Sequence, residues 1–485
     1  MNKLSKANEY VAKNHIAKEE LPVFHVTPPC GWMNDPNGFS AFQGKAHLFY
    51  QFHPYSDAWG PMHWGHCETE DFMKWTELPV ALAPDQSYDA AGCFSGSGIE
   101  TDQGHLLVYT GVIEKEENGE KICRQNQCSA LGDGKTYVKT EGNPVVTGEM
   151  LPQTFSREHF RDPKIGKQED GYYMVVGNKT EDGVPQVVMF SSEDLKEWKY
   201  VSVLASDEEG KYGSMWECPD FFLLDGEYVL ITSPQDISAG PELHNGNNSV
   251  YYLGKYEKKT HKFHYEQVYS LDDGLDFYAP QTMQTPDGRR IMIGWMKSWD
   301  SDVRPAGQKW NGMMTLPREL RMEQGRLMQC PVREIEKYYK NSVSYEKENI
   351  QGIRKLENIS GRVLDMTVEI TDGDYREFTV DFAQDAQHKV SFSYYKNKKM
   401  FEIDRTYSGM VRDVLSNRKV RVKSSDAKMK MRFILDKYSA EIFINDGAQV
   451  FSTTFYTPMN ADGIQFVCDG SAVVNIHKHD IEVNN

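Results

Sequence analysis

Apolar residues occur in short runs along most of the chain, and the spacing of these runs indicates β-structure. From about residue 31 onwards, runs rich in Val, Ile, Phe, Tyr and Trp alternate with turns of Gly, Asp and Asn, which is the pattern of short strands. Only the N-terminal arm and residues 332–339 have a helical character. The pattern therefore predicts an all-β protein that begins with a helical arm.

A weak repeat divides the first two thirds of the chain. The segments Thr69 to Trp75 and Ser192 to Trp198 are similar, and each comes late in its unit. Polar or acidic motifs open the units at intervals of roughly 60 residues, at Asn34-Asp35, Ser95-Gly96-Ser97, Arg161-Asp162, Glu217-Cys218-Pro219-Asp220 and Asp276-Phe277-Tyr278-Ala279. Five units of this length fit the four-stranded blades of a β-propeller.

The repeat predicts a site, because the innermost strand of every propeller blade lines one central channel. Asp35, Asp162 and Glu217 are predicted to be equivalent in the repeat and to meet in space. Taken singly, these motifs are also typical of turns, because Asp-Pro and Asn-Gly sequences favour tight bends. Three carboxylates at matching places favour a functional site over three unrelated turns.

Composition excludes several classes of partner. The 485 residues include 54 Lys and Arg against 71 Asp and Glu, and the formal net charge of -17 repels nucleic acid and anionic lipid. The eight cysteines lack the spacing of a zinc site and are expected to be free thiols. The first 20 residues are rich in Lys and Glu and have no apolar run, so we expect neither a signal peptide nor a membrane span, and a cytoplasmic protein.

Three motifs are highly specific in combination: Trp32-Met33-Asn34-Asp35-Pro36-Asn37-Gly38, Arg161-Asp162-Pro163 and Glu217-Cys218. The chain that carries them resembles the β-fructofuranosidases of glycoside hydrolase family 32, which include invertases, inulinases, levanases and sucrose-6-phosphate hydrolases. The similarity covers nearly the whole chain, through Tyr50-Gln51-Phe52, Trp59-Gly60, His63-Trp64-Gly65-His66, Phe94-Ser95-Gly96-Ser97, Asp276-Phe277-Tyr278-Ala279-Pro280-Gln281, Gly294-Trp295 and Leu316-Pro317-Arg318-Glu319-Leu320.

The resemblance implies a five-bladed β-propeller followed by a C-terminal β-sandwich, which agrees with the repeat. From about residue 341, polar and apolar residues alternate as in strands, for example over 378–382 and 429–433. Asn445-Asp446-Gly447 predicts a hairpin turn, because Asp-Gly accepts positive φ. We expect an N-terminal arm at 1–30, a catalytic propeller at 31–335 and a sandwich at 341–485.

The resemblance also implies roles for the three carboxylates. Cleavage of a glycosidic bond requires a carboxylate at the oxocarbenium carbon and an acid at the leaving oxygen. By resemblance Asp35 is the nucleophile, Glu217 the acid and then the base, and Asp162 the stabiliser of the transition state. The implied outcome is retention, with the reacting carboxyl groups roughly 5 to 5.5 Å apart. Repulsion among the three is expected to raise the pKa of one carboxyl, so that Glu217 is protonated while Asp35 is charged.

Neutral and aromatic side chains in the same motifs are candidates for sugar binding. Amides and hydroxyls can sort sugar hydroxyls, and flat rings can contact sugar C–H groups; the candidates are Asn34, Gln51, Ser95, Trp59, Phe94, Tyr278 and Trp295. Phe94 and Trp295 fit packing between blades equally well. Three roles suit Arg161: it binds a sugar hydroxyl, it keeps Asp162 ionised, or it forms a purely structural ion pair. His63 and His66 lack a third ligand, so we expect no metal and no other cofactor.

The expected partner is a small sugar, either sucrose, sucrose 6-phosphate or a short fructan, and nothing in the sequence indicates an oligomeric state. Sucrose 6-phosphate is the leading hypothesis. A cytoplasmic enzyme would receive sugar from a transporter, which delivers sucrose 6-phosphate if it phosphorylates the sugar, and the chain resembles sucrose-6-phosphate hydrolases. Cations that could meet a phosphate, or simply be solvated, are Lys297, Arg304, Lys309 and Arg318. The alternatives are an intracellular β-fructosidase for short fructo-oligosaccharides, a fructosyltransferase, an inverting arabinanase-type propeller and a non-catalytic sugar-binding propeller.

Overall fold

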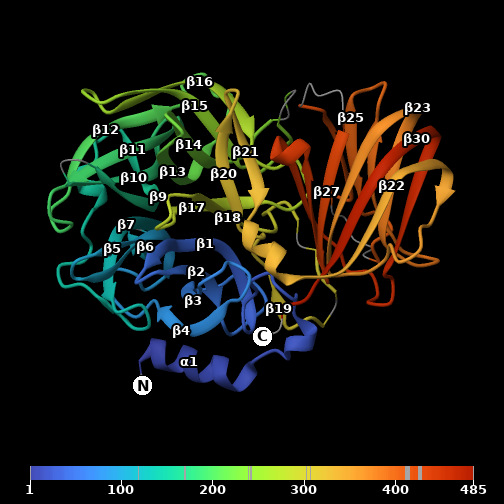
Figure 1. Ribbon diagram of the computed structural model, residues 1–485. Helices are drawn as coiled ribbons and strands as arrows, with labels where there is room; N and C mark the ends of the chain where they lie inside the picture. Colours follow the sequence, from blue (N-terminus) through green and yellow to red (C-terminus); the bar gives the residue numbers. More distant parts are fainter. Residues whose placement is uncertain are drawn as a thin grey trace.

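The N-terminal arm lies against the outside of the first blade in the computed structural model (Figure 1). Helix α1 (Lys3–Asn14) begins after Asn2, whose side chain accepts a hydrogen bond from the backbone N–H of Ser5, and its buried residues include Ala7 and Val11. A short 3₁₀ turn, η1 (Lys18–Glu20), follows. The structure describes residues 2–117, 119–168, 171–238, 240, 243–301, 303–305, 307–409, 415–423 and 429–483.

Five blades follow the arm, and each contains four antiparallel strands that run outward in chain order. The first two blades contain β1 (Gly31–Phe42), β2 (Lys45–His53), β3 (His63–Thr69) and β4 (Thr76–Leu82), then β5 (Gly92–Thr101), β6 (Gly104–Glu117), β7 (Glu120–Gly132) and β8 (Tyr137–Lys139). After turn η2 (Gly148–Met150), the third blade contains β9 (Phe155–Gln168), β10 (Gly171–Thr180), β11 (Pro185–Ser192) and β12 (Lys199–Ser206).

The last two blades complete the ring. They contain β13 (Met215–Leu224), β14 (Glu227–Gln235), β15 (Val250–Glu257) and β16 (Lys262–Ser270), then β17 (Tyr278–Gln284), β18 (Arg290–Trp295), β20 (Arg318–Glu323) and β21 (Arg326–Pro331). Strand β19 (Trp310–Asn311) leaves the fifth blade and pairs in parallel with the start of β1. This pairing joins the last blade to the first, and the predicted five-bladed propeller is confirmed.

The sequence repeat corresponds to a repeated turn. Thr69 and Ser192 both end the third strand of a blade, and the hydroxyl of each accepts a hydrogen bond from the backbone N–H three residues later. Those donors, Phe72 and Leu195, have positive φ values of 61° and 68°. The two segments therefore occupy the same late place in blades one and three, as the sequence predicted.

Each inner strand contains a β-bulge at its predicted motif. In blades three, four and five, the strand pairing resumes only after two skipped residues, which are Asp162-Pro163, Cys218-Pro219 and Ala279-Pro280. The first residue of each skipped pair has positive φ, at 66°, 49° and 51°. The expected equivalence of Asp35, Asp162 and Glu217 is therefore wrong. Glu217 precedes its bulge and matches Arg161, whereas Asp35 is the second skipped residue of its strand and Asp162 is the first of its own. A bulge re-aims side chains, and so all three positions can face the channel.

The C-terminal domain is a β-sandwich made from one hydrogen-bonded set of nine strands. After η3 (Arg333–Tyr338), it contains β22 (Tyr339–Arg354), β23 (Leu364–Gln384), β24 (Val390–Tyr395), β25 (Met400–Asp404), β26 (Asn417–Arg421), β27 (Met429–Asp436), β28 (Ser439–Ile444), β29 (Gln449–Thr454) and β30 (Gly463–Ile481). The first half of β23 pairs with β27 and its second half with β24, so this strand links the two layers. The expected hairpin at 445–447 joins β28 to β29, with Asp446 at φ 59° and Gly447 at φ 95°.

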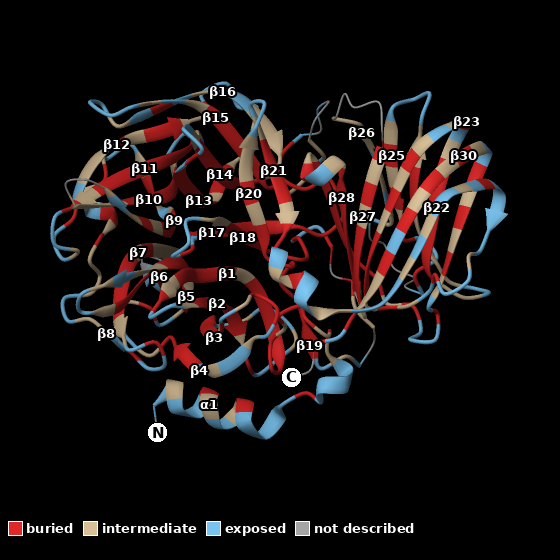
Figure 2. Cartoon of the chain, in the orientation of Figure 1, coloured by how far each residue is buried: buried red, intermediate tan, exposed pale blue. Residues whose placement is uncertain are grey.

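Buried charges connect the two domains, and strands β27 and β28 beside the propeller are largely buried (Figure 2). The fully buried Arg318 donates to Glu441 of the sandwich at 2.6 Å and to Asp272 of the propeller at 3.1 Å. His25 of the arm lies between Asp436 at 2.8 Å and Glu441 at 3.1 Å. Arm, propeller and sandwich therefore share one electrostatic network. The eight cysteines form no disulfide, and no helix of the described residues is long and apolar enough to cross a membrane.

Candidate active site

A cavity of about 600 Å³ opens where the inner strands of the blades converge. The structure brings Asp35 of β1, Asp162 of β9 and Glu217 of β13 together in its wall, as the repeat predicted. The bulges place these residues, because the side chains of a regular strand would alternate between its two faces. Three carboxylates from three blades thus share one concave site.

Asp35 is held from two sides. The amide of Asn34 donates to its Oδ1 at 3.0 Å, and the hydroxyl of Ser95 donates to its Oδ2 at 2.9 Å. The indole N–H of Trp32 donates to the amide oxygen of Asn34 at 2.7 Å, which orients that amide. Burial and the negative charge of Glu217 raise the pKa of Asp35 to about 6, while the two hydrogen bonds act to lower it. Asp35 is thus charged near neutral pH and fixed in direction.

Glu217 is surrounded by donors from three neighbouring strands. Arg161 donates to its Oε1 through Nε at 3.0 Å and Nη2 at 2.8 Å. Its Oε2 accepts from the amide of Gln235 at 2.9 Å and lies 2.6 Å from the hydroxyl of Tyr278. That hydroxyl also lies 3.0 Å from the carbonyl of Ser233. Because a hydroxyl can donate and accept, Tyr278 can hydrogen-bond to Glu217 in either protonation state.

Asp162 lies deeper, beside Cys218. The backbone N–H of Cys218 donates to Asp162 Oδ2 at 3.0 Å, and its thiol lies 3.7 Å from the same oxygen and 3.8 Å from Asp35 Oδ2. Burial raises the pKa of Asp162, and the charges of Glu217 and Asp35 act in the same direction against the opposing effect of Arg161. Burial also raises the pKa of the Cys218 thiol, which argues against a thiolate nucleophile.

Most of the expected sugar-binding residues line the cavity. The lining includes Asn34, Gln51, Trp59, Phe94, Ser95 and Arg161. Trp59 is 50% exposed at the mouth and meets Phe94 edge to face at 6.0 Å. Tyr278 and Trp295 are absent from the described lining of this cavity. Tyr278 is buried behind Glu217 and supports the wall, whereas Trp295 packs against Trp32 and Trp299 and lines a smaller hollow beside the cavity.

The four cations expected near a phosphate lie in different environments. Arg318 is fully buried between the domains, so it is removed from any substrate. Lys297 is 2% exposed and donates to Asn311 at 2.6 Å. Lys309 is exposed but does not line the cavity. Only Arg304 reaches a neighbouring hollow, where it pairs with Asp57. The sequence shows which residues are cationic, but it does not show which of them bond to other side chains in the fold.

The comparisons with known proteins agree with this geometry. Residues 25–331 match the description "Glycosyl hydrolases family 32 N-terminal domain", and residues 334–483 match "Glycosyl hydrolases family 32 C terminal". The chain belongs to glycosyl hydrolase family 32. Together the two matches span the propeller and the sandwich, and so the resemblance seen in the motifs extends to both domains.

Family 32 relatives match over nearly their full length. The chain is 34% identical to a sucrose-6-phosphate hydrolase of Zymomonas mobilis, across 98% of this chain and 95% of the relative. It is 35% identical to a raffinose invertase of Escherichia coli, across 93% of each protein. A solved β-fructofuranosidase of Bombyx mori superimposes with a TM-score of 0.85 at 31% identity, across 99% of this chain and 98% of that one.

Several residues that line this family 32 cavity were not predicted from the sequence. They are Cys123, Gln125, Glu158, His159, Gln235, Asp236, Asn247 and Trp299. Gln235 ends β14, opposite the start of the strand that carries Glu217. Its place in the cavity therefore depends on the strand pairing within the blade, which the sequence does not show. Trp299 begins a segment rich in polar and charged residues, which was the available signal.

His63 and His66 both make contacts with protein groups. His63 Nδ1 lies 2.9 Å from the carbonyl of Pro61, and burial lowers the pKa of His63 to about 4. His66 stacks on Phe49 at 4.0 Å and lies 3.0 Å from a nitrogen of His47. Among the described residues, no group of three or more His, Cys, Asp or Glu side chains is placed to hold a metal ion.

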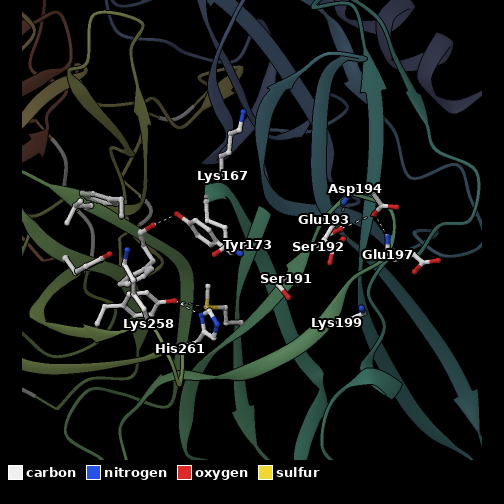
Figure 3. A pocket seen from close by; sticks show the side chains of 17 residues that line it. Lys167, Tyr173, Ser191, Ser192, Glu193, Asp194, Glu197, Lys199, Lys258 and His261 are labelled. Carbon is white, nitrogen blue, oxygen red and sulfur yellow. Dashed lines mark hydrogen bonds between the residues drawn. The ribbon is translucent and has the colours of Figure 1, made fainter. Parts of the chain in front are cut away.

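A larger hollow of about 840 Å³ lies between the outer parts of blades three and four (Figure 3). Some of its polar groups bond to one another or to the backbone: Tyr173 donates to the carbonyl of Phe221 at 2.7 Å, and Tyr256 lies 2.7 Å from His261. Asp194 accepts the N–H groups of its own turn.

Proposed function

We propose that this family 32 chain hydrolyses the β-fructofuranosyl bond of sucrose or sucrose 6-phosphate and releases fructose with retained configuration. The observation that carries the proposal is the placement of Asp35 and Glu217 in one cavity with different partners. Asp35 accepts hydrogen bonds from neutral groups, whereas Glu217 contacts a guanidinium, an amide and a phenol. Two carboxyl groups in such different surroundings suit the two roles that retaining cleavage needs.

In the first step, Asp35 attacks the anomeric carbon of the fructosyl unit while Glu217 gives a proton to the leaving oxygen. The C–O bond to the leaving sugar breaks, and an ester bond forms between Asp35 and fructose. Asn34 and Ser95 hold the attacking carboxylate in direction, which reduces the entropy lost on reaching the transition state.

In the second step, Glu217 takes a proton from water, and that water attacks the same carbon from the side that the leaving sugar vacated. The ester bond breaks and Asp35 returns as a carboxylate. Arg161, Gln235 and Tyr278 keep Glu217 in place through both steps. Asp162 is proposed to hold fructose hydroxyls by bonds that strengthen as the ring flattens.

The sugar contacts form the second part of the proposal. Gln51 and the exposed ring of Trp59 line the cavity together and suit one polar and one flat apolar contact. A variant of the Bombyx mori relative was solved in complex with sucrose, at 30% identity and a TM-score of 0.85.

We place the catalytic unit at 31–335 and the sandwich at 341–485. A cytoplasmic location is supported by the eight unpaired cysteines.

Proton NMR of the sugar products tests the mechanism. The full-length protein is mixed with sucrose, and the anomers of fructose are followed in the first minutes. We expect β-fructofuranose first, followed by slow mutarotation. Initial α-fructofuranose would contradict the double displacement and favour an inverting mechanism.

The Asp35→Ala variant provides the second test of the mechanism. Loss of the nucleophile is expected to lower kcat by about 10⁴-fold or more, whereas turnover at the wild-type rate would refute the role of Asp35. Asp446→Asn, in the distant sandwich hairpin, is the matched control for loss of one carboxylate and is expected to keep the wild-type rate.

A further inference from the structure

The walls of the catalytic cavity carry more carboxyl groups than cationic groups. Among the described lining residues, one side chain is a guanidinium and five are carboxylic acids, namely Arg161 against Asp35, Glu158, Asp162, Glu217 and Asp236. The single guanidinium already lies 2.8 Å from one of those acids. A second anion that entered this cavity would therefore meet carboxylates before it met an available cation.

Two of the acids lie at the mouth, away from the reacting groups. Asp236 is exposed, and its carboxylate accepts a hydrogen bond from the hydroxyl of Ser214 at 2.7 Å. Glu158 lies 3.6 Å from Arg124, and both of these side chains are substantially exposed. Arg124 offsets the charge of Glu158, whereas Asp236 bonds to a neutral hydroxyl and supplies the net negative charge at the mouth.

A side hollow of about 190 Å³ adjoins the cavity, and the two share Trp59 and Trp299. Arg304 lines this hollow and is the only one of the four cations considered for phosphate binding that reaches it. Its guanidinium is paired with the carboxylate of Asp57. The backbone carbonyl of Asp57 accepts a hydrogen bond from Asn311 at 3.0 Å, which holds this loop in place.

We infer that the site selects an uncharged sugar on the leaving side of the fructosyl bond and discriminates against a phosphomonoester there, with Asp57 masking Arg304. This inference rests on the proposed function and narrows its substrate to neutral β-fructofuranosides. A phosphomonoester carries a charge of about -1.5 to -2 at pH 7, and a receptor for it needs a cation with donors to spare. The charges at this mouth repel such a group.

The test compares kcat/KM for sucrose and for sucrose 6-phosphate, using the full-length protein at low ionic strength. We expect sucrose to be preferred by about tenfold or more, and added salt to narrow the difference. Equal values, or a preference for sucrose 6-phosphate, would overturn the inference and leave the proposed function standing. Release of fructose from neither substrate would overturn both.

The Asp57→Asn variant tests the masking of Arg304. It is expected to raise kcat/KM for sucrose 6-phosphate relative to sucrose by about fivefold or more, because the ion pair between the guanidinium and the Asp57 carboxylate is removed. The double variant Asp57→Asn, Arg304→Gln is expected to lose that gain. Asp446→Asn removes one carboxylate from an exposed pair with Lys430 in the sandwich and is the matched control. An unchanged ratio in Asp57→Asn would refute the masking role.

Discussion

Arg161 of the third blade and Glu217 of the fourth occupy the same place before their bulges, and their side chains meet, with Arg161 Nη2 2.8 Å from Glu217 Oε1. Tyr278 occupies that place in the fifth blade, and its hydroxyl lies 2.6 Å from the other oxygen of Glu217. One repeated backbone position thus supplies three consecutive members of a hydrogen-bond chain. The next position along the strand supplies Asp162 and Cys218, and the backbone N–H of Cys218 donates a hydrogen bond to the carboxylate of Asp162.

Replacement of Arg161 by Lys tests the first of these contacts. A lysine keeps the charge but loses the two N–H donors that meet Glu217 together, so we expect kcat for sucrose to fall by about 100-fold, with a smaller change in KM. Steady-state kinetics measure this split. Arg124→Lys, at a more exposed arginine, is the control and is expected to remain near wild type. A kcat within threefold of wild type for Arg161→Lys would contradict the proposed positioning role.

The pKa of Asp35 predicts an acidic limit to activity. Because burial and Glu217 raise that pKa to about 6, kcat/KM for sucrose should decline as the pH falls below about 6, where Asp35 becomes protonated. Ser95→Ala removes a hydrogen bond that lowers this pKa, so the acidic limb should move to higher pH. A pH profile of kcat/KM measures both effects. An acidic limb that stays at the same pH in Ser95→Ala would refute the assignment.

Arg318 predicts a large effect on stability far from the reaction. Its replacement by Met removes the guanidinium that pairs with the buried Asp272 and leaves Glu441 with His25, so the free energy of unfolding should fall by about 3 to 5 kcal/mol. Arg333→Met removes an ion pair whose arginine side chain is 66% exposed and should cost less than about 1 kcal/mol. Denaturant titration measures both variants, and equal losses would contradict the burial argument.

His25 makes the stability of the folded chain depend on pH. Burial acts to lower its pKa, but the hydrogen bonds and charges of Asp436 and Glu441 outweigh burial and raise it to about 9. Because the folded state holds this proton more tightly, the stabilisation is fully present below pH 6.5 and is lost as the pH rises through about 9. The unfolding midpoint should therefore decline over this range, and His25→Gln should decline less. Parallel declines would refute the role of His25.

Arg405 links the sandwich to the mouth of the cavity. It pairs with the buried Asp276, two residues before Tyr278, and donates to the hydroxyl of Ser301 at 3.1 Å, two residues after Trp299. We expect Arg405→Lys to raise KM for sucrose by about tenfold, because the loop that carries Trp299 loses a support. Arg376→Lys, at an exposed arginine in the same domain, is the control. An unchanged KM in a folded Arg405→Lys protein would refute this link.

The sequence by itself determined the architecture and the location of the site. Turn residues between apolar runs specified strands, and the recurring polar motifs specified five inner strands that had to converge. The helical arm and the short helical segment before residue 339 were also predicted correctly, as α1 and η3. These features depend on local backbone preference and on repetition, and both can be read along a single chain.

Only the tertiary structure decided which side chains face the cavity and which charges are paired. The bulges made Glu217 equivalent to Arg161 and not to Asp162, because a bulge shifts the alternation of side chains by one residue. Arg318 and Arg304 look alike in the sequence, yet Glu441 and Asp57, each more than a hundred positions away, already pair with them. Charge pairing across such separations follows from the fold and cannot be read from the residues themselves.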